Sequence, residues 1–128
     1  MIIGIDHIVL TVRDIEASVA FLAAALQGEA ITFAGGRRAV RVGNQKINLQ
    51  TLGQEPRNHA RVGSGDVCFL SDATPDAVAA HLTELGIEIL EGPVEKSGAQ
   101  GPIISHYFSD PDGNLIEIGC LVTEPDQA

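Results

Sequence analysis

The chain has 128 residues, 45% of them hydrophobic and 20% charged, which is typical of one globular domain or two small fused modules. Its formal net charge of −9 and its lack of Trp argue against nucleic acid and anionic membranes as partners, because phosphate binding needs clustered Lys and Arg. No apolar run reaches membrane-spanning length and no signal-like segment opens the chain, so we expect a cytoplasmic protein.

The first half of the chain predicts the order βαβββ. A β-forming run extends from Ile2 to Val12. Asp14 then caps a helix that ends at Gly28, and its apolar residues recur on one face: Ile15, Val19, Leu22 and Leu26. Three short strands follow, separated by glycine-containing turns, at residues 30–34, 38–42 and 46–52.

The second half repeats this order after a polar connector, residues 53–64. A strand is predicted over 66–70, and Thr74-Pro75 begins a helix that buries Val78, Leu82 and Leu85 and stops at Gly86. The next strand is predicted over 87–90, followed by a mobile glycine-rich loop over 92–101 and a final hairpin. The sequence therefore predicts an α+β fold of paired βαβββ modules, with one domain over 1–128 and modules over 1–52 and 65–122.

Two strands each combine an apolar face with one metal-capable side chain. Asp110-Pro111-Asp112-Gly113-Asn114 is a tight turn, and the apolar strand after it contains the carboxylate of Glu117. His7 has a matching place in the first strand. By itself His7 fits a core histidine and Glu117 an edge charge, but a buried carboxylate needs a cation or donors, so the two together suggest a shared site.

Strand alternation places further polar groups on the faces opposite the apolar ones. Asn48 and Gln50 alternate with Ile47 and Leu49, and Asp66 precedes Val67. The repeat pairs His7 with Asp66 on the first strands and Gln50 with Glu117 on the last strands, and curled sheets would line a cleft with these faces. Cys68 and Cys120 are expected to be reduced, buried and on opposite faces.

The chain resembles the vicinal oxygen chelate superfamily, which includes glyoxalase I, methylmalonyl-CoA epimerase, extradiol dioxygenases, fosfomycin-resistance enzymes and bleomycin-binding proteins. The resemblance depends on the Asp-His-Ile-Val-Leu opening at residues 6–10 and on Asp-Pro-Asp-Gly-Asn-Leu-Ile-Glu-Ile at residues 110–118, set on the repeated modules. The segments 43–49, 65–68 and 91–95 are similar to small glyoxalase-domain proteins within that superfamily.

This resemblance implies a set of metal ligands: His7, Gln50, Asp66 and Glu117. Asp66 stands where many members have His, and a single ligand histidine argues against an extradiol dioxygenase. Tyr107 matches a pocket tyrosine of the fosfomycin-resistance enzymes, although Val9 replaces the threonine expected there. Asn48 and Arg41 are further substrate-binding candidates; the arginines at 37, 38 and 41 form either a solvated edge or a site for an anionic substrate.

The resemblance implies a divalent-metal-dependent enzyme of the glyoxalase type. One ion of Mn²⁺, Fe²⁺, Co²⁺, Ni²⁺ or Zn²⁺ would bind two neighbouring oxygens of a small-molecule substrate and stabilise an enediolate or enolate, with Glu117 or Asp66 as the catalytic base. The alternative is a metal-free protein that binds a drug or metabolite, as bleomycin-resistance proteins do. A homodimer is also implied, with the site either within one chain or shared between two.

Overall fold

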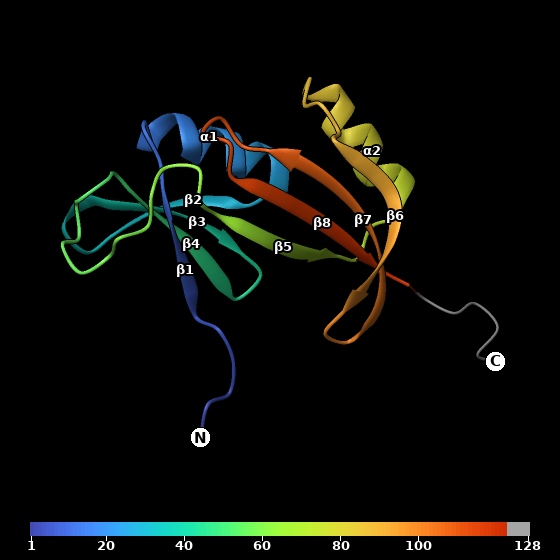
Figure 1. The fold of residues 1–128 in the computed structure, drawn as a ribbon, viewed down its shortest axis with the longest axis horizontal. Coiled ribbons are helices and arrows are strands. Elements are labelled where there is room, and N and C mark those ends of the chain that lie inside the picture. The colour runs from blue at the N-terminus through green and yellow to red at the C-terminus, as the bar shows by residue number, and fades with distance from the viewer. Residues whose placement is uncertain (123–128) are drawn as a thin grey trace. The chain divides into compact units, whose positions relative to one another are not determined.

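The computed structural model describes residues 1–122 and confirms the predicted α+β fold (Figure 1). Its elements are β1 (His7–Thr11), α1 (Ile15–Leu26), β2 (Glu29–Phe33), the short 3-10 helix η1 (Ala34–Gly36), β3 (Arg37–Val42), β4 (Gln45–Gln50), β5 (Asp66–Ser71), α2 (Pro75–Glu84), β6 (Glu91–Gly98), β7 (Gly101–Ser109) and β8 (Leu115–Leu121). The described part of the chain thus has the eight strands and two substantial helices that the repeat predicts.

The chain divides into two compact units. The first unit comprises Met1–Gly65 and the turn Asp110–Asn114, and the second comprises Asp66–Ser109 and the strand that starts at Leu115. Each unit contains one four-stranded sheet, in the order β1-β4-β3-β2 in the first and β5-β8-β7-β6 in the second. Within each sheet one pair is parallel, β1 with β4 and β5 with β8, and the other pairs are antiparallel.

Both helices begin as the sequence predicts. The Asp14 side chain accepts a hydrogen bond from the amide of Ala17, and the Thr74 hydroxyl accepts one from Ala77, so each satisfies a free amide of the first turn. Val19, Leu22, Val78 and Leu82 are buried against their sheets. Leu85 was expected in the core but is 42% exposed, because it is the C-cap residue, where α2 ends.

Two strand predictions were wrong. The first strand begins at His7 rather than Ile2, because its ladder with β4 starts at the pair His7 and Lys46, one residue after β4 itself begins. The predicted strand over 87–90 and loop over 92–101 are instead an irregular segment followed by β6. This strand tolerates Pro93 because it is an edge strand, and the ladder is irregular between Glu91 and Val94.

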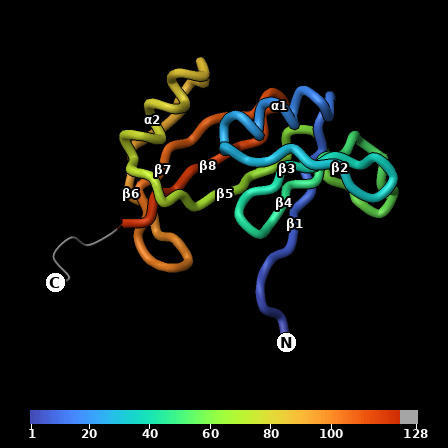
Figure 2. The backbone as a smooth tube through the Cα atoms, turned by 180° about the vertical axis from the view of Figure 1, so that it is seen from behind, coloured from blue at the N-terminus to red at the C-terminus, as the bar shows by residue number. Residues whose placement is uncertain are grey.

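The predicted turn before β8 forms a tight hydrogen-bonded unit. Asp110 accepts bonds from the amides of Asp112 and Asn114, and the Asn114 amide group donates back to Asp110. Asp112 accepts hydrogen bonds from the backbone and the side chain of Arg13, just before α1 begins. Figure 2 shows the tube between β7 and β8 passing beside α1. The motif therefore ties the turn to the start of α1 inside the first unit.

Candidate functional site

The four predicted metal ligands are divided between the units. His7 and Gln50 lie in the first unit, and Asp66 and Glu117 lie in the second. Register-paired residues of neighbouring strands share a face of the sheet, so the register gives the same-face neighbours of each polar candidate. Asn48 is flanked by Val9 and Ala39, and Glu117 is flanked by Cys68 and Tyr107.

The register corrects one part of the internal repeat. His7 pairs with Lys46, two residues before Asn48, and Asp66 pairs with Leu115, two residues before Glu117. Asn48, not Gln50, is therefore the counterpart of Glu117.

The distances from His7 along the strands also favour Asn48 over Gln50 as its neighbour. Gln50 pairs with Thr11, which lies four residues, or about 13 Å, along β1 from His7. Asn48 pairs with Val9, which lies two residues, or about 6.6 Å, from His7. Gln50 also donates a hydrogen bond of 3.0 Å to the Thr11 hydroxyl. The Asn48 carbonyl oxygen, in a residue only 4% exposed, has no hydrogen-bond partner within residues 1–122. Register and bonding both favour Asn48 over Gln50 as the companion of His7.

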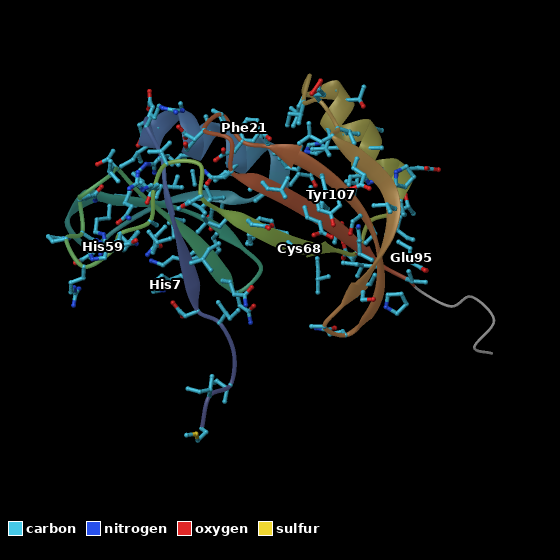
Figure 3. All side chains as sticks on the ribbon, viewed as in Figure 1. His7, Phe21, His59, Cys68, Glu95 and Tyr107 are labelled. Carbon is cyan, nitrogen blue, oxygen red and sulfur yellow. The ribbon has the colours of Figure 1, made fainter. Side chains whose placement is uncertain are left out.

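His7 has a carboxylate behind its ring. Its Nδ1 lies 2.8 Å from Oδ2 of Asp6, and the carboxylate can only accept, so we assign the ring proton to Nδ1. That assignment leaves Nε2 with a free lone pair on a half-exposed side chain of β1 (Figure 3). Metal-binding histidines commonly donate their other ring N–H to a carboxylate, which fixes the tautomer. Asp6 was not singled out by sequence reasoning, although it directly precedes His7.

Glu117 is held by a buried serine on the next strand. The Ser105 hydroxyl donates to Oε2 of Glu117 over 2.6 Å, and Ser105 is fully buried. A short hydrogen bond to a carboxylate is stronger than one between neutral groups. It constrains one carboxylate oxygen, and the side chains of Cys68 and Tyr107 interact with the same carboxylate. Ser105 was also missed, since a serine in an apolar strand carries no motif.

Two groups beside Glu117 are kept protonated. Loss of solvation, followed by the charge of Glu117, raises the pKa of the Cys68 thiol to about 11. The same two causes raise the pKa of the Tyr107 hydroxyl. By register both residues flank Glu117 on its own face of the sheet. Figure 3 labels Cys68 on β5 and Tyr107 on β7. Cys68 is exposed, which corrects its predicted burial, while Cys120 is buried on the other face and both thiols are free.

The remaining candidate residues are ion-paired, exposed to solvent or buried on the opposite face of their sheet. Arg41 forms an ion pair with Glu29 on the neighbouring strand, and Asp66 is exposed at the start of β5. His59 is exposed in the connector, and His106 is buried on the face that packs on α2, as expected from alternation. Burial lowers the pKa of His106. Within the described residues, no three His, Cys, Asp or Glu side chains are grouped as a metal site would need.

The sequence of almost the whole chain matches a known family. The family model of the Glyoxalase/Bleomycin resistance protein/Dioxygenase superfamily matches residues 4–118. The chain belongs to this superfamily. None of the helices within residues 1–122 combines the length and apolar character needed to cross a membrane.

Several members of the superfamily are close relatives. The chain is 46% identical to virulence protein STM3117 of Salmonella typhimurium, over 92% of this chain and 84% of that protein. It is 44% identical to the glyoxalase domain-containing protein RDO1 of Mycosarcoma maydis, over 90% of this chain and 66% of that protein. An integron cassette protein of V. Cholerae has the same fold, with a TM-score of 0.89 and 46% identity over 95% of this chain and 98% of the other.

More distant structures share the fold and differ in their described activities. A lactoylglutathione lyase from Agrobacterium tumefaciens superposes with a TM-score of 0.72 at 24% identity, covering 91% of this chain and 92% of that one. The antibiotic-binding protein TnmS3 from a Streptomyces species superposes with a TM-score of 0.75 at 22% identity, covering 94% and 98%. At these identities the likeness is one of fold.

Proposed function

We propose that the protein is a divalent-metal-dependent enzyme of the glyoxalase type, acting on a small molecule with two neighbouring oxygens. The observation that carries the proposal is that its two strongest ligand candidates are each oriented by a second group. Asp6 holds the His7 ring and Ser105 holds the Glu117 carboxylate. Such outer partners are typical of residues that bind a metal.

The residues fit a borderline divalent cation by their chemistry. One imidazole, two carboxylates and one amide oxygen form a set that suits Mn²⁺, Fe²⁺, Co²⁺, Ni²⁺ or Zn²⁺. His7, Glu117 and Asp66 would hold the ion, with the Asn48 oxygen as a fourth donor in place of Gln50. When bound, the ion supplies Lewis-acid stabilisation of negative charge on a substrate oxygen.

The chain's own residues then account for proton movement. The Glu117 carboxylate could take a proton from a carbon next to a carbonyl group, while the hydrogen bond from Ser105 fixes the orientation of the carboxylate. Tyr107 and Cys68 stay protonated beside it and offer hydrogen-bond donors to the substrate. Isomerase and lyase chemistry are both compatible with this arrangement.

Metal binding tests the proposal directly. Protein purified without added metal should be analysed for bound ions and titrated with Mn²⁺, Ni²⁺ and Zn²⁺ by calorimetry. His7→Ala and Glu117→Ala should each abolish binding, whereas His59→Ala, a histidine exposed in the connector, should not alter it. Unchanged affinity in Glu117→Ala would overturn the proposal, and the metal-free drug- or metabolite-binding alternative would replace it.

We also propose a homodimer in the cytoplasm, and the same variants address its arrangement. Light scattering at micromolar concentration should give twice the chain mass. Mixing His7→Ala with Glu117→Ala protein regenerates one intact site only if the ligands come from two chains. Recovery of metal binding in the mixture would assign a site shared between subunits, and no recovery in a confirmed dimer would assign a site within one chain.

A further inference from the structure

One face of the first sheet, opposite the core residues Leu10, Val40 and Ile47, carries rows of mixed polar and apolar residues. Reading across β1, β4, β3 and β2, the first row is His7, Lys46, Arg41 and Glu29, and the second is Val9, Asn48, Ala39 and Ile31. Past the end of the β3–β4 ladder, the pairs Thr11 with Gln50 and Arg37 with Phe33 stand in the place of a third row. We call this surface the Asn48 face.

Lys46 reaches diagonally across the Asn48 face. Its Nζ lies 3.2 Å from the centre of the Phe33 ring, although the two residues are two rows and two strands apart. The contact therefore joins side chains from the first and the third row of this face. Ala39 stands in the row between them, and its small side chain is fully buried. Lys46 and Phe33 therefore form a strap across the face.

Buried polar groups lie beside this strap. Asn48 and Gln50 are 4% and 5% exposed, and the Asn48 oxygen has no partner within the described residues. A buried, unpaired polar atom is costly, and a catalytic role or a bound ion or water is among the reasons for which native structures keep one. The face is thus prepared for a ligand that the strap covers.

The charges on the face indicate what that ligand carries. Arg37 lies 4.9 Å from the same Phe33 ring, and within residues 1–122 neither Lys46 nor Arg37 is in an ion pair. The other two arginines of β3 differ, since Arg38 bonds to Glu16 and Arg41 to Glu29. Four of the eight Lys and Arg residues, all within residues 1–122, are in an ion pair, so Lys46 and Arg37 share this feature with Arg61 and Lys96. Lys46 and Arg37 differ from those two because both lie against the Phe33 ring. The charge of Arg37 also helps to lower the pKa of Glu55.

We propose that Lys46 is a movable anion-binding residue, which rests on Phe33 when the Asn48 face is empty and turns to pair with an oxyanion group of the substrate when it is filled. The ligand class is a small organic anion with a carboxylate or phosphate group. A cation on an aromatic ring is held less strongly than one in a charge-assisted hydrogen bond, so the exchange is favourable. The inference rests on the proposed function only in naming this ligand as its substrate.

The two lysines of the sequence, Lys46 and Lys96, allow a direct test. Reductive ¹³C-methylation gives one NMR signal for each, apart from the N-terminus, and Lys46→Met and Lys96→Met assign them. The Lys46 signal should be shifted upfield by the Phe33 ring and should move to its ordinary position in Phe33→Leu. Lys96, 5.7 Å from the Tyr107 ring in the other unit, is the matched control.

Metal-free protein is then titrated with oxalate and, separately, with inorganic phosphate at constant ionic strength. We expect the Lys46 signal to move downfield and saturate while Lys96 does not, and Lys46→Met to weaken binding by about tenfold to a hundredfold. A response to one anion alone assigns the ligand as a carboxylate or a phosphate. An unshifted Lys46 signal in the free protein, or equal responses of both lysines, would overturn the inference. Because no metal is present, failure of the metal site leaves this result unaffected.

Discussion

Replacing Ser105 with Ala should weaken metal binding without touching a metal ligand. The hydroxyl donates over 2.6 Å to Glu117 from a fully buried position, so the substitution removes a strong bond and frees the carboxylate to rotate. Loss of such an outer partner typically lowers metal affinity 10- to 100-fold, or by about 1.4 to 2.8 kcal/mol. Calorimetry with Co²⁺ measures the change, and the absorption spectrum of the cobalt-loaded protein reports any altered coordination.

A matched control separates orientation of Glu117 from a general packing effect. Ser18→Ala removes the hydroxyl of another buried serine, on α1 in the first unit, whose nearest polar partner is Asp112 at 3.5 Å. Cobalt affinity and spectrum should be unchanged in this variant. Equal loss of affinity in the two variants, or none in Ser105→Ala, would refute the positioning role of Ser105.

Three further predictions follow from single contacts. Asp112→Ala should lower the free energy of unfolding by about 1–3 kcal/mol in urea titration, because two bonds from Arg13 are lost; an unchanged midpoint would contradict this. The Cys68 thiol, with a pKa of about 11, should be alkylated slowly at pH 8 and faster as pH rises, and Glu117→Gln should speed the reaction; rapid alkylation of the unmodified protein at pH 8 would count against it. Hydrogen bonds from the Arg57 side chain and then from its backbone amide lower the pKa of Glu55 to about 2, so Arg57→Ala, which keeps the amide, should raise that pKa part of the way toward 4.5 in an NMR titration; a value still near 2 would exclude the Arg57 side chain as a cause.

Short-range sequence features were enough to predict the superfamily and the repeated βαβββ order. Helix caps at Asp14 and Thr74, the glycine turns and the turn before Glu117 are short-range features, so they predicted the elements and their order. Alternation also placed Cys68 and Cys120 on opposite faces of the sheet, because the side-chain period of a strand is two.

Register and side-chain partners could not be obtained in that way. Which residue of β4 stands beside which residue of β1 depends on pairing between segments about 40 residues apart. The sequence repeat matched Gln50 to Glu117, whereas the two ladders match Asn48 to Glu117. The Ser105 bond to Glu117 and the reach of Lys46 to Phe33 depend on the same ladders. The sequence alone thus determined the elements, their faces and the family, whereas tertiary structure decided the neighbours, because strand pairing brings together side chains that no local pattern relates.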